Sequence, residues 1–187
     1  MGEPITDGIS RNGSDDDING GTGTPPPGYS FPTHKLAKTL QDSTKIPLVL
    51  VACGSYSPVT YLHLRMFEMA ADHFNGHAKY ELIGGYFSPV SDYYQKEGLA
   101  PAHHRVRMCE LATESDSAWL MVDSWEALQA SYQRTAVVLD HFDDELNKNM
   151  GGMTLPDGSK REIRILLLAG GDLIESMGRK DVWASED

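Results

Sequence analysis

One short run of apolar residues constrains the fold of this chain more than any other feature. Residues 46–52 read IPLVLVA and offer no polar side chain to either face of a strand. Such a continuous run is typical of a strand buried on both faces of a sheet. The segments that follow this run decide what kind of sheet it belongs to.

Helical and strand patterns alternate after this run. Residues 60–74 carry apolar side chains at helical spacing, at positions 62, 66, 69, 70 and 74. Further strands are predicted over 78–87, 118–123 and 162–169, and helices over 100–113, over 125–148 with a break near Ser131, and in GGDLIESMG after the last strand. Val138, Phe142 and Leu146 share one helical face. The alternation predicts an α/β, Rossmann-like parallel sheet covered by helices on both faces.

The first 44 residues have a different composition. They hold seven of the 18 glycines and five of the 10 prolines, including GGTGTPPPG. Few large apolar side chains are available there to offset the entropy of ordering. We therefore predict a disordered, dispensable tail over residues 1–44 and a folded domain over 45–187.

Composition also excludes several classes of protein. The formal net charge of −11 disfavours nucleic acid as a partner, because that binding needs clustered Lys and Arg. No run reaches the ~20 apolar residues of a membrane helix, and the N-terminus lacks the pattern of a secretory signal. Cys53 and Cys109 are too few for a disulfide framework or a zinc site. A location in the cytosol or nucleus, away from membranes, is expected.

The turn after the first strand has the chemistry of an anion site. Gly54 lets backbone and ligand come close, and Ser55 adds a hydroxyl. Thr60 is a candidate N-cap, and His63 falls in the first helical turn, where the helix dipole favours anions. A second glycine turn, Gly170-Gly171, follows the last strand. Ligands of such sheets bind at the carboxyl ends of the strands, so both turns are candidate site segments.

Four blocks of sequence resemble one enzyme family in order and spacing. They are ACGSYSPVTYLHLRMFEMA (52–70), FSPVSDYYQKEGLAPAHHRVRMCELA (87–112), VDSWEALQASYQRT (122–135) and LLLAGGDLIESMG through VWASED (166–187). Together they resemble the eukaryotic nicotinamide mononucleotide adenylyltransferases, members of the nucleotidyltransferase superfamily. The [HT]xxH signature of that superfamily reads Thr60-Tyr61-Leu62-His63 here.

The resemblance implies a reaction and its participants. The family joins ATP to nicotinamide or nicotinate mononucleotide and releases diphosphate, with Mg²⁺ held by the ATP phosphates. His63 is then the catalytic residue, acting on the ATP phosphates, and no metal is expected to be held by the protein itself. The resemblance implies that substrates contact Gly54, Ser55, Tyr56, Thr60, Lys96, Tyr132, Thr135, Gly170, Asp172 and Trp183.

Particular roles follow from the match. Lys96 corresponds to a lysine that meets the mononucleotide phosphate, and Asp172 to an aspartate that contacts a nucleotide. Tyr132, Thr135 and Trp183 correspond to residues around the pyridine ring. Glu126 is expected to be a cap or a salt-bridge partner and not a general base.

Some alternatives stay open at this point. The family continues beyond the last matched block, so the chain resembles the first two-thirds of such an enzyme. A catalytically impaired remnant that binds nucleotides or a protein partner is therefore the alternative function. An oxidoreductase is disfavoured, because no GxGxxG follows the first strand. The preferred mononucleotide is not indicated, and a homo-oligomer is left open.

Overall fold

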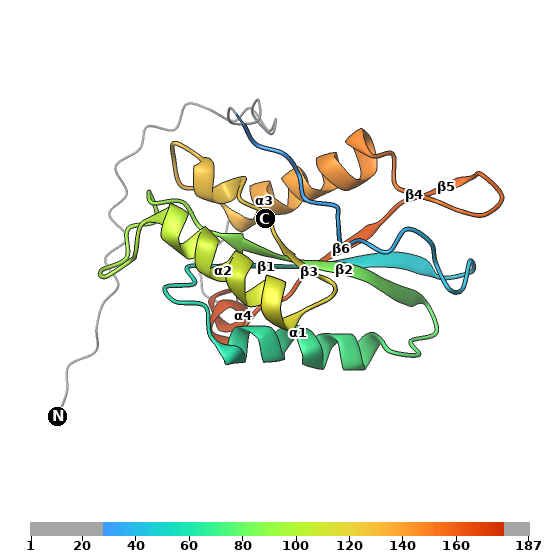
Figure 1. Cartoon of the computed structure of the whole chain (residues 1–187), viewed down its shortest axis with the longest axis horizontal. Coiled ribbons are helices and arrows are strands. Elements are labelled where there is room, and N and C mark those ends of the chain that lie inside the picture. Colours follow the sequence, from blue (N-terminus) through green and yellow to red (C-terminus); the bar gives the residue numbers. More distant parts are fainter. Residues whose placement is uncertain (1–27, 178–187) are drawn as a thin grey trace.

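Four parallel strands form the central sheet in the order β3-β2-β1-β6 (Figure 1). The computed structural model describes residues 28–177. The elements in chain order are β1 (Ile46–Gly54), α1 (Tyr61–Phe74), β2 (Tyr80–Pro89), α2 (Ala102–Asp116), β3 (Leu120–Val122), η1 (Glu126–Leu128), α3 (Thr135–Asp143), η2 (Asp144–Asn149), β4 (Met153–Thr154), β5 (Lys160–Arg161), β6 (Arg164–Leu167) and α4 (Gly171–Met177). The predicted Rossmann-like parallel sheet is confirmed.

Alternate side chains of β1 pack on opposite faces of the sheet. Leu48 and Leu50 belong to the core cluster on the side of α1 and α2, whereas Val49 and Val51 belong to the cluster on the side of α3. Figure 1 shows α1 below the sheet and α3 above it. The apolar run in the sequence therefore has the predicted cause, a central strand with helices on both faces.

The predicted helix over 125–148 consists of three shorter elements. A turn of 3₁₀-helix, η1, is followed by irregular backbone at 129–134, then by α3, and α3 continues into the π-helical turn η2. The expected break near Ser131 is confirmed. The shared face predicted for Val138, Phe142 and Leu146 is also confirmed, since all three side chains are buried in one cluster. A turn at Pro156-Asp157-Gly158 connects the two strands of a hairpin, β4–β5.

Residues 28–45 pack against the domain, and we call them the strap. In Figure 1 the strap is the blue segment that runs from beside α3 to the start of β1. Leu36 and Leu40 lie in the core cluster on the α3 side, and Tyr29 and Phe31 pack against it. The prediction of a disordered tail is therefore wrong for residues 28–44. Residues 1–27 lie outside the described part of the chain.

Specific features of β2 receive the strap. A Cβ on Gly84 would lie 2.5 Å from Cδ2 of Leu36, so any larger residue there would force this buried leucine side chain to shift. Ile83 is an extra residue in the β1–β2 register, a β-bulge, and its carbonyl accepts the Ala37 N–H at 2.8 Å. The strap is also tied to α2, because Lys35 Nζ donates to the Thr113 and Ser117 carbonyls at the end of that helix. These contacts explain why the strap is ordered despite its composition.

Within residues 28–177, no helix combines the length and apolar content needed to cross a bilayer.

Candidate functional site

The strand order places a topological switch between β1 and β6. From β1 the chain crosses to β2 and β3 on one side, and it later returns to β6 on the other side of β1. Crevices for ligands form at such a point, at the carboxyl ends of the strands. Gly54 ends β1, and Gly170 follows β6. The two predicted glycine turns therefore lie at the same edge of the sheet.

Gly54 is required by the side chain two residues later. The chain turns back so that the Tyr56 ring lies against Gly54, where a Cβ would sit 2.9 Å from Cζ of that ring. Tyr56 has a φ of 43°, and its hydroxyl donates to the Ala52 carbonyl at 2.7 Å. The Tyr56 hydroxyl is therefore buried under the turn and bonded within it. Only the Tyr56 backbone remains available to a ligand.

Thr60 and His63 form a capping box at the start of α1. The Thr60 N–H donates to His63 Nδ1 at 2.9 Å, and the Thr60 hydroxyl also lies 2.9 Å from Nδ1. Because Nδ1 accepts the backbone N–H, the neutral imidazole carries its proton on Nε2. The predicted N-cap at Thr60 is confirmed. The cap also fixes which His63 nitrogen can donate to a ligand.

The surroundings of His63 favour the neutral imidazole. The ring is half-buried and meets the Tyr56 ring edge-on, with centroids 5.1 Å apart. Burial lowers the pKa of His63, because removal from water disfavours the imidazolium. His63 therefore offers a neutral Nε2–H donor at the carboxyl edge of the sheet at pH 7.

Lys96 reaches the same turn from the loop between β2 and α2. Its Nζ lies 3.4 Å from Ser55 Oγ, and the side chain is otherwise exposed. The same loop is tied to the turn at a second point, where Ser57 Oγ accepts the Ala100 N–H at 3.0 Å. The structure thus brings Ser55, His63 and Lys96 to one edge of the sheet.

Arg105 anchors this arrangement, although it was not among the residues predicted from the sequence. The side chain is completely buried, and its guanidinium donates to the Ser55 and Ala100 carbonyls at 3.0 and 2.6 Å. It also pairs with Asp92 at 3.2 Å. The sequence did hold a pattern that could have indicated Arg105. Ala102, Arg105 and Cys109 are spaced by three and four residues, so they share the inward face of α2. A charged residue on a buried face indicates a role in fixing neighbouring backbone.

Tyr132 and Thr135 lie on the far side of the Lys96 loop. The Tyr132 ring stacks on Tyr94 with centroids 5.7 Å apart, and Ser91 Oγ donates to the Ser131 carbonyl at 3.3 Å. Thr135 is the first residue of α3. The loop with Lys96 therefore bridges the β1 turn and the segment with Tyr132.

The remaining predicted residues follow β6. Asp172 is the second residue of α4, and nothing is described of its side chain. Trp183 lies outside the described residues.

Glu126 is a buried carboxyl beneath the carboxyl ends of β1 and β2. Ser88 Oγ donates to Glu126 Oε2 at 2.5 Å. The prediction of a cap or salt-bridge partner is wrong, since among the described residues its partner is this hydroxyl. Burial raises the pKa of Glu126 to about 8, although the Ser88 hydrogen bond opposes the rise. The carboxyl is therefore mostly protonated at pH 7.

The raised pKa of Glu126 predicts how the free energy of unfolding depends on pH. Between about pH 5 and 8 the folded chain keeps a proton that the unfolded chain, with the ordinary Glu value near 4.5, has released. The free energy of unfolding should thus fall as pH rises through this window, by up to ~1.4 kcal/mol per pH unit. Glu126→Gln should flatten that slope in urea unfolding across the window. Glu97→Gln, at an exposed position, is the control, and an equal slope in the Glu126 variant and the parent would contradict the assignment.

A family model described as cytidylyltransferase-like matches residues 51–184. The matched range includes the capping box, Lys96, Arg105 and the Tyr132 region. The chain belongs to this cytidylyltransferase-like family.

Curated relatives of this cytidylyltransferase-like chain carry more specific names. Nicotinamide/nicotinic acid mononucleotide adenylyltransferase 2 of Saccharomyces cerevisiae is 65% identical over 85% of this chain and 40% of the relative. The corresponding enzyme of Schizosaccharomyces pombe is 65% identical over 85% of this chain and 43% of its own length. Nicotinamide/nicotinic acid mononucleotide adenylyltransferase 1 of Bos taurus is 40% identical over 79% of this chain and 62% of its own. The resemblance drawn from the sequence is confirmed, and the chain spans less than half the length of the two yeast relatives.

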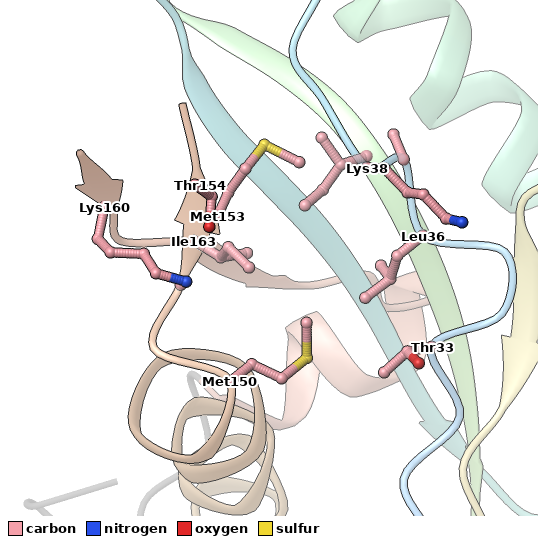
Figure 2. Close-up of a pocket in the computed structure, with 11 residues that line it drawn as sticks. Thr33, Leu36, Lys38, Met150, Met153, Thr154, Lys160 and Ile163 are labelled. Carbon is pink, nitrogen blue, oxygen red and sulfur yellow. The ribbon is translucent and has the colours of Figure 1, made fainter. Parts of the chain in front are cut away.

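This cytidylyltransferase-like chain also has a cavity away from the candidate site. The cavity has a volume of about 360 Å³ and lies between the strap and the β4–β5 hairpin. Figure 2 shows Thr33, Leu36 and Lys38 on one side, facing Met150, Met153 and Lys160 on the other. Ile163, in its wall, directly precedes β6, so the cavity is not at the carboxyl edge.

Proposed function

We propose that the chain belongs to an enzyme that transfers AMP from ATP to nicotinamide or nicotinate mononucleotide. A phosphate oxygen of the mononucleotide bonds to the α-phosphorus of ATP, and the bond from that phosphorus to the β-phosphate bridge breaks. The products are NAD or its deamido form and diphosphate. The observation that carries the proposal is the Gly54–His63 turn, whose neutral imidazole donor and neighbouring lysine face one edge of the sheet. The names of the relatives support this choice of substrates.

The proposed reaction needs no nucleophile from the protein, because the mononucleotide phosphate attacks ATP directly. Two anionic reactants must be aligned, and the charge that builds on the phosphates must be stabilised. His63 Nε2–H and the backbone N–H groups at the start of α1 would bind phosphate oxygens of ATP. Lys96 would bind the phosphate of the mononucleotide, and Tyr132, Thr135 and Trp183 would hold its pyridine ring.

Mg²⁺ would enter this site with ATP. The side chains at the β1 turn are the Ser55 hydroxyl, the His63 imidazole and the Lys96 ammonium, and none of them is the carboxylate by which proteins usually hold Mg²⁺. We therefore propose that the triphosphate holds the ion and that the ion neutralises part of its charge. A location in the cytosol or nucleus belongs to the same proposal.

The test is an assay of residues 1–187 with ATP, Mg²⁺ and each mononucleotide in turn. Dinucleotide is followed by chromatography, and binding of each reactant is measured by calorimetry. We expect the mononucleotide to bind and dinucleotide to form only when both reactants are present. Absence of both binding and dinucleotide would contradict the proposal.

Lys96→Ala is expected to weaken binding of the mononucleotide by about 10- to 100-fold, because a charge-assisted hydrogen bond to phosphate is lost. Binding of ATP should change much less. Calorimetric titration of each reactant provides the measurement. Lys79→Ala removes an exposed lysine just before β2, at the opposite end of the sheet, and serves as the matched control. Equal losses in the two lysine variants would show a general effect of charge.

A further inference from the structure

The strap contributes a side chain to the base of the segment that carries Tyr132. We call residues 124–134, which connect β3 to α3, the Tyr132 segment. Asp123 directly precedes this segment, and His141 lies in α3 after it. His141 Nε2 lies 3.0 Å from Asp123 Oδ2, so the two ends of the segment are joined by one buried contact.

A second contact joins the start of the Tyr132 segment to α3. The indole of Trp125, within the Tyr132 segment, stacks on the His141 ring with centroids 4.3 Å apart and an interplanar angle of 7°. The backbone N–H of Trp125 donates to Asp123 Oδ1 at 3.3 Å, and Gln129 Nε2 donates to the backbone carbonyl of Trp125 at 3.0 Å. Asp123, Trp125 and His141 thus form a clamp at the base of the segment.

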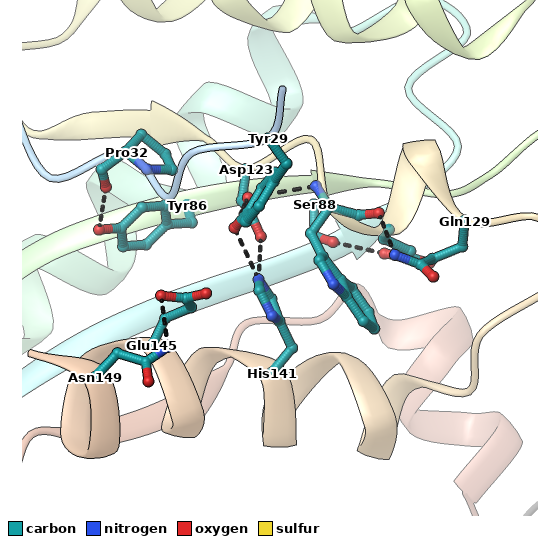
Figure 3. Close-up of polar contacts among 11 residues, drawn as sticks. Tyr29, Pro32, Tyr86, Ser88, Asp123, Gln129, His141, Glu145 and Asn149 are labelled. Atoms are coloured by element: carbon teal, nitrogen blue, oxygen red, sulfur yellow. Dashed lines mark hydrogen bonds and ion pairs between the residues drawn. The ribbon is translucent and has the colours of Figure 1, made fainter. Parts of the chain in front are cut away.

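Tyr29 of the strap completes this clamp. Its hydroxyl donates to Asp123 Oδ1 at 2.8 Å and lies 2.9 Å from His141 Nε2 (Figure 3). Because a carboxylate only accepts, Nε2 of His141 carries the proton that faces Asp123 and the Tyr29 oxygen. Burial and the negative charge of Asp123 raise the pKa of Tyr29, so the phenol stays protonated and keeps donating. Removing this hydroxyl would leave a fully buried carboxylate with one donor fewer.

The clamp joins the two ends of the segment, and Tyr132 belongs to the stretch between them. The tip of the segment touches the Lys96 loop through the Tyr94–Tyr132 stack and the Ser91–Ser131 hydrogen bond. An opening at the base therefore changes where Tyr132 and the start of α3 lie relative to Lys96.

We infer that Tyr29 is a positioning residue, which fixes the Tyr132 segment for binding of the mononucleotide. The inference rests on the proposed function for its ligand, but the ordering of the segment can be measured without one. Through Tyr29, the strap would thereby contribute to the site from beside the carboxyl end of β3.

The experiment compares Tyr29→Phe with Tyr86→Phe in residues 1–187. Tyr86 is the matched control, because its hydroxyl also joins the strap to the domain, donating to the Pro32 carbonyl at 2.8 Å. The amides of Leu128 and Gln129 are hydrogen-bonded within the segment, so their hydrogen exchange reports its opening. Tyr29→Phe should speed their exchange by about 10-fold and weaken mononucleotide binding by a similar factor, with ATP binding within about twofold. Tyr86→Phe should change neither.

Two outcomes would overturn the inference. One is equal exchange at Leu128 and Gln129 in the two variants, and the other is an equal loss of ATP and mononucleotide binding in Tyr29→Phe. If the unmodified chain binds no mononucleotide, the proposed function fails, while the exchange rates still decide whether Tyr29 orders the segment. Thermal unfolding checks that Tyr29→Phe folds. If it does not, native-state exchange of the unmodified chain decides, since the amides of Leu36 and Gln129 should then open together.

Discussion

His63→Ala is expected to slow dinucleotide formation by about 10²–10³-fold, with a much smaller change in KM. Its Nε2–H would act on charge that develops at the phosphates, and removal of one such preorganised donor has an effect of this size. Steady-state kinetics with ATP and mononucleotide varied separately provide the measurement. A rate within twofold of the parent would remove His63 from the catalytic mechanism.

Two further variants separate catalysis from helix capping. His73→Ala removes an exposed histidine from the last turn of the same helix and should leave the rate unchanged. His63→Gln can restore the cap, because glutamine also accepts the N-cap N–H in a capping box. Its stability should match that of the parent while its rate stays low. Recovery of the rate in His63→Gln would show that the cap, and not the imidazole, is what the reaction needs.

Deletion of residues 28–45 is expected to unfold the domain. The deletion removes Leu36 and Leu40 from the core, and each such leucine is worth ~2–5 kcal/mol when truncated to alanine. The summed loss is comparable with the ~5–15 kcal/mol by which a domain of this kind is stable. Circular dichroism and urea unfolding provide the measurement.

Point variants give a graded version of this test. Leu36→Ala should lower the free energy of unfolding by ~2–5 kcal/mol. Leu62→Ala, at a position that is 80% exposed, should change it by less than ~0.5 kcal/mol. A shortened chain that unfolds at the same urea concentration as the parent would mean that the strap adds nothing to the core.

The parts of the fold that the sequence predicted depend on local patterns. The run at 46–52 has one physical explanation, burial on both faces, and the helical periodicity of 60–74 has another. The Thr60–His63 cap is similarly local, since both residues lie within one turn. The position of the glycine turns then followed from the geometry of parallel sheets, without any knowledge of side-chain contacts.

The parts that escaped prediction depend on contacts between distant residues. Tyr29 bonds to residues 94 and 112 positions away, and nothing in its own neighbourhood indicates a partner. Residues 1–44 are enriched in glycine and proline, and this concealed the few apolar side chains of the strap. The sequence indicated Gly54 only as a place where a ligand could come close, and the close approach of the Tyr56 ring seen in the structure had no local signal. Arg105 was missed because an arginine on a helix is usually solvated.

The part that His63 plays in capping α1 has a consequence for the thermodynamics of ligand binding. A histidine on a surface normally samples several rotamers and gives up that freedom when a ligand arrives. The Thr60 N–H holds Nδ1 from the moment α1 forms, so the side-chain entropy of His63 is lost in folding and not in binding. Relaxation measurements on the imidazole should therefore give nearly equal order parameters in the free and the nucleotide-bound chain.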